Sequence, residues 1–410
     1  MYRILFLHKD FPGQFLHLAR HLAGLPGVEV RALASDPAAP VDGVAVTTYQ
    51  VKAPADGRPH PYLHLPDQAI WRAQAVLVAC VGLQQTGFVP DLVIGHNGWG
   101  ETLFIKDVWP RARLIGYCEF YYHGQGADVG CDPEFPATLG DVARVRVMNA
   151  VNLLTLEAMD RGVSPTRWQH GLHPAAYRDR ISRLHDGIDT VAASPGPARP
   201  LTLPDGRVLA PGTPIVTYVA RDLEPYRGFH TLMRAASLFL EQVPDAHLVI
   251  AGGDGVSYGN PPREGGSWRT RMLSELAGRL PLDRVHFLGH VPHDGFINLM
   301  RLSRTHVYLT YPFVLSWSML EAMACGVTLV ASATPPVQEV VAHGANGLLV
   351  PPLDPAAIAA GIVAALALPA SARRDLGAAA RQTVLRHFDS AQVAMPAWLG
   401  MLRRDFGLPD

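Results

Sequence analysis

Two arginines six positions apart, Arg221 and Arg227, stand in a proline-containing turn after an apolar stretch of the chain. The guanidinium group presents a planar fork that matches the oxygens of a phosphate, so two of them could hold one diphosphate. Asp222 and Glu224 lie between them. The alternative is a solvated loop in which the arginines pair with these carboxylates, and the spacing leaves both interpretations open.

A second segment, residues 311–326, is predicted to be a short loop and a helix that begins near Ser316 or Ser318 and ends at a glycine. Free N–H groups at a helix start can bind a phosphate. Glu321 lies one turn inside the helix, where its carboxylate could accept hydrogen bonds from a ribose diol. The spacing Ser318-x-x-Glu321 is also that of a capping box, in which the glutamate bonds its own backbone. The pattern alone favours the cap.

Three candidate catalytic groups, His96, Glu119 and His123, follow apolar stretches in the first half of the chain. Aromatic residues beside them suit a sugar acceptor, because aromatic faces stack on sugar rings and polar tips orient hydroxyl groups. A lone histidine is more often structural than catalytic, so the prediction depends on the two segments together. In the segment 8–15, Gly13 either lets backbone N–H groups approach an anion or a sugar hydroxyl, or forms a plain turn.

Short apolar stretches alternate with longer helical patterns along the chain, which is typical of parallel β-α-β units. Predicted strands begin near residues 3, 28, 91 and 113 in the first half and near 215, 247, 285, 306, 328 and 347 in the second. They are almost continuously apolar, as expected of strands that are covered on both faces. Because ligands of such sheets bind beyond the carboxyl ends of the strands, the polar segments that follow them are where a site is expected.

A chain of 410 residues exceeds what one hydrophobic core usually serves, so two domains are expected. Proline and glycine gather between residues 192 and 213, which makes 191–212 the predicted linker. The predicted domains are then residues 1–190 and 213–390. The hydrophobic share of 48% and the charged share of 17% are those of a folded globular protein.

Composition argues against several classes of protein. Lysine and arginine number 35 and aspartate and glutamate 36, so no excess of positive charge favours nucleic acid. The four cysteines are scattered and suit reduced thiols in the cytoplasm better than disulfides or a zinc site. The N-terminus is apolar too briefly for a signal peptide, and the longest apolar run, 356–368, is shorter than the roughly 20 residues of a membrane span. We expect a cytoplasmic protein without a metal site.

These segments together resemble the GT4 family of GT-B glycosyltransferases, the glycosyl transferases group 1. The likeness covers most of the chain, and the order and spacing of its segments are more specific than any one of them. The segments are HDGID at 185–189, Arg221 with Arg227-Gly228, AGGDG at 251–255, VHFLG at 285–289, LEAMACG at 320–326, and the stretch from Glu339-Val340-Val341 to NGLLV at 346–350.

The resemblance implies an α/β protein with the GT-B fold, in which two Rossmann-like domains face each other across a cleft. It implies that Arg221 and Arg227 neutralise the diphosphate of a nucleotide-sugar donor and that Glu321 holds the donor ribose. Residues 391–410 would form a helix that crosses back to the first domain. The other donor-binding candidates are Gly13, Ser316, Trp317, Ser318, Gly289 and His290, the last two beside the base.

Two positions depart from the family pattern. Phe313 stands eight positions before Glu321, where the family carries the first glutamate of an E-x7-E motif that ordinarily contacts the donor sugar. Phe313 is therefore a candidate donor contact with an altered grip on the sugar. Glu119 falls roughly where many members carry a catalytic-site histidine, so all three catalytic candidates stay open. An inserted loop, 256–267, is expected in the cleft wall.

The resemblance implies a retaining transfer of a sugar to a hydroxyl of a glycan, glycolipid or small molecule, without metal or cofactor. A glycolipid acceptor would bring the protein into peripheral contact with the inner face of the membrane. Two alternatives are a nucleotide-sugar or glycan binding protein without transferase activity and a GT-B sugar-nucleotide epimerase or hydrolase. A dehydrogenase is disfavoured because the first predicted strand is not followed by G-x-G-x-x-G.

Overall fold

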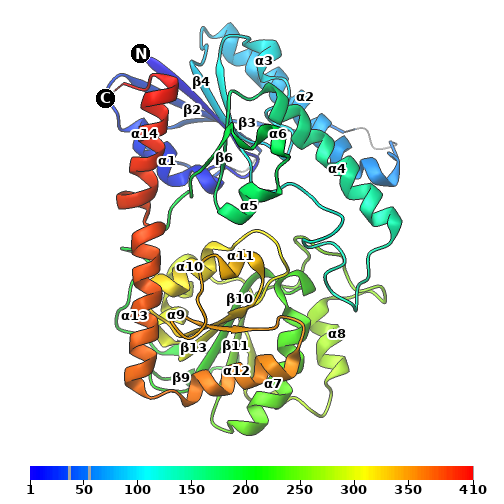
Figure 1. Cartoon of the computed structure of the whole chain (residues 1–410), viewed down its shortest axis with the longest axis vertical. Coiled ribbons are helices and arrows are strands. Elements are labelled where there is room, and N and C mark those ends of the chain that lie inside the picture. Colours follow the sequence, from blue (N-terminus) through cyan, green and yellow to red (C-terminus); the bar gives the residue numbers. More distant parts are fainter. Residues whose placement is uncertain (36–37, 54–56, 410) are drawn as a thin grey trace. The chain divides into compact units, whose positions relative to one another are not determined.

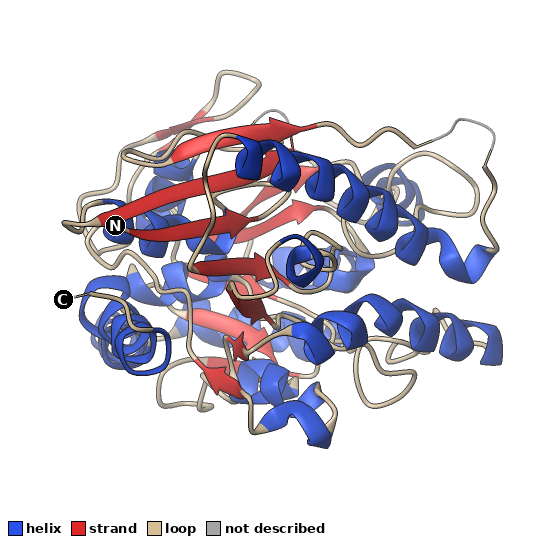
Figure 2. Cartoon of the chain, turned by 90° about the horizontal axis from the view of Figure 1, so that it is seen from above, coloured by secondary structure: helices blue, strands red, loops and turns tan. Residues whose placement is uncertain are grey.

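The structure is a computed structural model that describes residues 1–35, 38–53 and 57–409. The chain divides into two compact units, each with its own parallel sheet surrounded by helices (Figures 1 and 2). Unit 1 consists of Met1–Gly187 and Ser390–Asp410, and unit 2 of Ile188–Asp389. The α/β class expected from the alternating pattern is confirmed.

Unit 1 contains a seven-stranded parallel sheet with the strand order β3-β2-β1-β4-β5-β6-β7. Its strands are β1 (Tyr2–Leu7), β2 (Val28–Ser35), β3 (Ala45–Tyr49), β4 (Leu92–His96), β5 (Arg113–Tyr117), β6 (Arg161–Ser164) and β7 (Ile181–Arg183). Its helices are η1 (Gly13–Phe15), α1 (Leu16–Ala23), η2 (Pro61–Leu63), α2 (His64–Gln85), α3 (Ile105–Val108), α4 (Leu139–Ala158), α5 (Arg167–Leu172), α6 (Ala175–Arg178), η4 (Ser390–Ala394) and α14 (Met395–Phe406).

Unit 2 contains a six-stranded parallel sheet with the order β12-β11-β10-β13-β14-β15. Its strands are β10 (Ile215–Asp222), β11 (His247–Gly253), β12 (Val285–Phe287), β13 (Thr305–Tyr308), β14 (Leu329–Ser332) and β15 (Leu348–Val350). Its helices are η3 (Pro225–Arg227), α7 (Phe229–Gln242), α8 (Trp268–Glu275), α9 (His293–Leu302), α10 (Trp317–Ala324), α11 (Pro335–Gln338), α12 (Pro355–Ala367) and α13 (Ala370–His387).

In both sheets the first strand along the chain lies centrally, between the second strand and the fourth. The order reverses at that point, and the loops that follow the two central strands lie beside each other there. A ligand site in an open α/β sheet is expected at such a switch point. In unit 1 these loops follow β1 and β4, and in unit 2 they follow β10 and β13.

The segment predicted as a linker, 191–212, belongs instead to unit 2. It contains an antiparallel hairpin of β8 (Leu201–Thr202) and β9 (Val208–Leu209). Leu203 and Leu209 are buried in the core of this unit. Proline and glycine mark tight turns here rather than a free connection, because the apolar residues between them are packed.

The last part of the chain, from Ser390 onward, belongs to unit 1. In this unit α14 lies beside α1 (Figure 1). Trp398, Met401 and Leu402 are buried in the core with residues of β1 and β4. The indole N–H of Trp398 donates to the carbonyl oxygen of His185 at 3.3 Å. The chain therefore passes into unit 2 after Gly187 and returns at Ser390.

Among the described residues no single helix is long and apolar enough to cross a membrane. Only α12 and α13 taken together reach that length and composition, and they are bent by 111° at the break between them.

Candidate functional site

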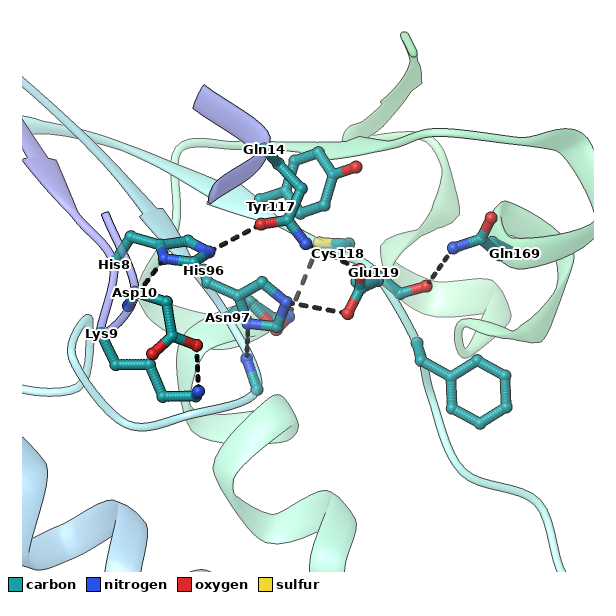
Figure 3. A network of polar contacts seen from close by, with 12 residues as sticks. His8, Lys9, Asp10, Gln14, His96, Asn97, Tyr117, Cys118, Glu119 and Gln169 are labelled. Carbon is teal, nitrogen blue, oxygen red and sulfur yellow. Dashed lines mark hydrogen bonds and ion pairs between the residues drawn. The ribbon is translucent and has the colours of Figure 1, made fainter. Parts of the chain in front are cut away.

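Polar side chains converge at the switch point of unit 1 (Figure 3). His8 follows β1 directly, His96 is the last residue of β4, and Glu119 lies two residues after β5. The side-chain amide of Gln14 donates to Glu119 Oε1 at 2.8 Å and its carbonyl oxygen lies 2.6 Å from His8 Nε2. His96 Nε2 lies 3.2 Å from Glu119 Oε2. The fold thus joins four side chains from three loops into one network.

The backbone sets the direction of the hydrogen bonds in this network. The N–H of Asp10 donates to Nδ1 of His8, and the N–H of Gly98 donates to Nδ1 of His96, both at 3.1 Å. A neutral imidazole whose Nδ1 accepts must carry its proton on Nε2. His8 therefore donates to Gln14, and His96 donates to the carboxylate of Glu119.

Electrostatics favour an ionised Glu119 beside a neutral His8. Burial alone would raise the pKa of Glu119, but the hydrogen bonds from His96 and Gln14 lower it, and the net shift is downward. Burial and the neighbouring His96 lower the pKa of His8 to about 4. A quarter of the Glu119 side chain, 25%, stays exposed, so the carboxylate can reach a bound molecule. His96 is fixed by stacking on Trp99, with ring centroids 3.7 Å apart.

The third catalytic candidate, His123, is not part of this network. Its Nε2 lies 2.7 Å from the carbonyl oxygen of Leu172, at the end of α5, and its ring lies 5.8 Å from that of Tyr121. Gly13 lies beneath His8 with a φ of +46°, and an added Cβ would come within 2.3 Å of the imidazole. Glycine is required there because the imidazole of His8 occupies that space.

Unit 2 contains a cavity of about 400 Å³ among the loops that follow β10, β11, β12 and β13. Six of the predicted donor residues line it: Arg221, Arg227, His290, Ser316, Ser318 and Glu321. The other four do not belong to the described lining, and one of them, Gly13, lies in unit 1. Phe313 is 7% exposed and packs against aromatic rings, Trp317 is 43% exposed, and Gly289 has a φ of +68°.

Arg227 is a buried cation in the wall of this cavity, with 8% of its surface exposed. Its Nη1 donates to the hydroxyl of Tyr308 at 3.1 Å, the hydroxyl of Thr310 at 2.9 Å and the carbonyl oxygen of Val314 at 3.1 Å. All three acceptors are neutral. A buried charge with neutral partners is costly unless a charge of opposite sign joins it. The carboxylate of Glu224 interacts with this cation electrostatically but makes none of these hydrogen bonds. The guanidinium group beside the cavity therefore suits an anionic ligand.

The carboxylates between the two arginines make their hydrogen bonds with the loop that follows β11. Glu224 is fully buried and accepts hydrogen bonds from three successive backbone N–H groups, those of Ser257, Tyr258 and Gly259. Asp222 accepts a hydrogen bond from the hydroxyl of Ser257. The loop in which both carboxylates pair with the arginines is not what the structure shows.

Glu321 does not close a capping box with Ser318. The N-cap of α10 is Ser316, whose hydroxyl oxygen accepts from the N–H of Ser318 at 3.3 Å. The carboxylate of Glu321 instead lies 2.7 Å from Nε2 of His293, the first residue of α9. This hydrogen bond raises the pKa of His293.

Sequence reasoning missed His8, Gln14, His293 and Tyr258. His8 and Gln14 lie in the polar segment that follows the first predicted strand. Because a site is expected in such segments, their position in the sequence already pointed to them. His293 lies 28 residues before Glu321, and only the fold brings the two together.

Two family models match the sequence. Residues 26–193 match the one described as glycosyl transferase family 4 group, and residues 205–383 match glycosyl transferases group 1. A D-inositol 3-phosphate glycosyltransferase of Kribbella flavida is 28% identical over 348 residues, which cover 82% of this chain and 77% of the relative. The enzyme of the same name from Mycolicibacterium vanbaalenii is 32% identical over 178 residues, 43% of this chain. This match spans only 38% of that relative's length, and the match to its Mycolicibacterium gilvum counterpart spans 37%.

Solved structures share the fold. A sucrose-phosphate synthase from Thermosynechococcus elongatus superimposes with a TM-score of 0.71 at 21% identity and covers 99% of both chains. HepE from Anabaena in complex with UDP-glucose gives a TM-score of 0.66 at 17% identity, over 98% of this chain and 100% of the other. The two parallel sheets and these neighbours give the chain the GT-B fold.

Proposed function

We propose that this chain, a member of the glycosyl transferases group 1, moves a sugar from a nucleotide-diphosphate-sugar donor to an acceptor hydroxyl group with retention of configuration. The observation that carries the proposal is Arg227, a buried cation in the wall of a cavity whose three hydrogen-bond acceptors are neutral. A diphosphate is the anion that this family's donors supply. Arg221, which lines the same cavity, adds a second guanidinium.

In this proposal the diphosphate leaves under electrostatic stabilisation by the protein itself. Arg221 and Arg227 neutralise its charge, and the N–H groups at the start of α10 point at it. Glu321 holds the donor ribose with the same carboxylate that His293 contacts. These groups stabilise the leaving diphosphate without a metal. The acceptor hydroxyl attacks the face of the sugar from which the diphosphate departs. Retention and metal independence come from the family resemblance.

The acceptor side is assigned to unit 1, at the network of His8, Gln14, His96 and Glu119. An ionised carboxylate that is held by neutral donors and remains partly exposed can accept a hydrogen bond from a sugar hydroxyl. His96 orients this carboxylate by donating to Oε2. We propose Glu119 as the group that contacts the acceptor hydroxyl and His96 as its positioning residue.

The decisive test is donor binding followed by transfer. UDP, GDP, ADP and TDP and their glucose derivatives are titrated by calorimetry, with UDP-glucose first because it is bound in HepE. D-inositol 3-phosphate joins the acceptor panel because the relatives carry it in their names. Arg221→Ala is expected to weaken nucleotide binding at least about tenfold, the loss of one charge-assisted contact of about 1.5–3 kcal/mol. Arg221 is exposed, so this variant is expected to fold normally.

Arg207→Ala is the matched control, because Arg207 pairs with Asp205 on the surface of the same unit. Unchanged nucleotide binding by Arg221→Ala, or equal losses in both variants, would contradict the site assignment.

A second candidate function is binding of a nucleotide sugar without transfer. It is favoured by Phe313, whose ring lies 5.4 Å from that of Tyr226 and 5.0 Å from that of Tyr258, in place of a carboxylate. Nucleotide-sugar binding without release of nucleotide, with or without an acceptor, would support this candidate. Release of nucleotide without an acceptor would instead support an epimerase or hydrolase.

A further inference from the structure

The inserted loop that follows β11 is tied to the cavity wall by two carboxylates, those of Asp222 and Glu224. Oε1 of Glu224 accepts from the N–H groups of Ser257 at 3.2 Å and Tyr258 at 3.0 Å, and Oε2 accepts from that of Gly259 at 2.8 Å. Glu224 is 0% exposed. Taking a carboxylate out of water is costly, and backbone N–H groups that converge on it offset that cost. The three residues it holds are therefore fixed in one conformation.

The residue at the centre of this loop presents an aromatic ring to the cavity. Tyr258 lines the cavity and is still 38% exposed, so part of its ring is free to touch a ligand. The ring lies 5.3 Å from the guanidinium carbon of Arg227 and 5.0 Å from the ring of Phe313. Tyr226 lies behind it at 6.1 Å. Tyr258 thus forms an apolar wall beside the proposed diphosphate position.

The position of this wall indicates which part of a donor it meets. The cavity residue after β12, His290, lies over Gly253, where an added Cβ would be 2.5 Å from its Nε2. The ring neighbours of Tyr258 come instead from η3 and from the segment after β13. The family resemblance places the base near His290, and the group beyond the diphosphate on the Tyr258 side is then the transferred sugar.

We propose that Tyr258 is a donor-specificity residue that stacks on the transferred sugar, and that Glu224 is the positioning residue that holds it in place. The inference rests on the proposed function. A sugar that binds this wall presents a face of C–H groups to the ring, because an aromatic face stacks on such a surface but cannot accept the hydrogen bonds that a carboxylate would. The surface that contacts the sugar is then apolar where the rings of Phe313 and Tyr258 lie together.

The test compares a nucleoside diphosphate with its sugar derivative. UDP, GDP, ADP and TDP are screened first, and the one that binds most tightly is titrated alone and as its glucose conjugate. Relative to Tyr258→Phe, Tyr258→Ala is expected to weaken binding of the conjugate about threefold to tenfold, the range of one aromatic contact, and to leave the free diphosphate within about twofold. Tyr258→Phe keeps the ring and removes the hydroxyl that interacts with Arg227, so this variant separates the effect of the ring from that of the hydroxyl.

Glu224→Ala is expected to reproduce the loss seen in Tyr258→Ala, and the double variant to lose no more than either single one. Glu275→Ala is the matched control, since this carboxylate pairs with Arg234 and does not line the cavity. Thermal unfolding of each variant separates altered binding from altered folding.

Three outcomes would overturn the inference. Equal losses for the free diphosphate and the conjugate would place Tyr258 against the nucleoside rather than the sugar. Additive losses in the double variant would show that Glu224 does not act through Tyr258. If the wild type binds none of the nucleotides, the proposed function fails and this inference fails with it; if nucleotides bind and Tyr258→Ala changes nothing, only the inference fails.

Discussion

Glu321 accepts a hydrogen bond from His293, and this contact links donor binding to pH. The bond to the carboxylate raises the pKa of His293 above its ordinary 6.5. The ion pair is therefore complete below pH 6.5, and it is lost as the pH rises through the raised value. A protonated His293 competes with a ribose diol for the same carboxylate. Donor binding should thus strengthen as the pH rises.

The measurement is the dissociation constant of the best nucleoside diphosphate between about pH 6 and about pH 9, a range that brackets a raised histidine pKa. The wild type is expected to bind more tightly at the upper end than at the lower. In His293→Ala this dependence should be flatter, because the competitor is gone. The nucleotide's own phosphate ionises in the same way with both proteins, so the ratio of their constants is the quantity to compare. A ratio that does not change with pH would rule the competition out.

Local spacing predicts some residues of the site, and long-range topology decides the others. Arg221 and Arg227 lie six positions apart on one loop, so their common cavity could be anticipated from the sequence. Glu321 was ambiguous because a capping box and a ligand contact share one spacing, and the structure shows Ser316 as the cap. His123 has the right residue type at a strand end, but a carbonyl group of α5 holds it.

Gly377, in α13, lies where this helix packs against the end of α10. An added Cβ would lie 2.0 Å from the carbonyl oxygen of Gly326, a backbone atom that cannot turn away. Replacing a helical glycine by alanine ordinarily stabilises by about 1 kcal/mol. Here overpacking, which costs about 1–3 kcal/mol, should outweigh that gain. Gly377→Ala is expected to lower the free energy of unfolding in urea.

Gly400, inside α14, supplies the comparison. An added Cβ there meets nothing within 4 Å. Gly400→Ala is therefore expected to raise the free energy of unfolding by up to about 1 kcal/mol through helix propensity alone. Two shifts of the same sign would contradict the packing argument.

The elements follow the sequence pattern most closely where burial on both faces enforces it. The predicted strands near residues 3, 91 and 215 are β1, β4 and β10, whose residues are largely buried. By contrast, β3 is an edge strand with exposed threonines, and β6 and β7 are four and three residues long. Such strands carry too few apolar residues to stand out, and their pairing depends on neighbours that are already in place.

The two units of the whole molecule should differ in their dependence on α14. Trp398 is 2% exposed and belongs to the core of unit 1. Replacing a buried tryptophan by alanine costs about 3–5 kcal/mol. Trp398→Ala is expected to destabilise unit 1, seen as faster amide hydrogen exchange in β1 and β4, while β10 and β13 keep their protection. Leu139→Ala is the control, because Leu139 is 85% exposed in the same unit. Equal loss of protection in both sheets would show that the units unfold together.

The path of the chain through the two units also has a consequence for its synthesis on the ribosome. All residues of unit 2 lie between Ile188 and Asp389, whereas the core of unit 1 includes the helix that ends at Phe406. A nascent chain folds as its segments emerge. All residues of unit 2 have therefore been translated while unit 1, although begun first, still lacks α14, whose apolar side chains are buried in its core. Unit 2, whose synthesis begins later, is therefore the first of the two units that can finish folding.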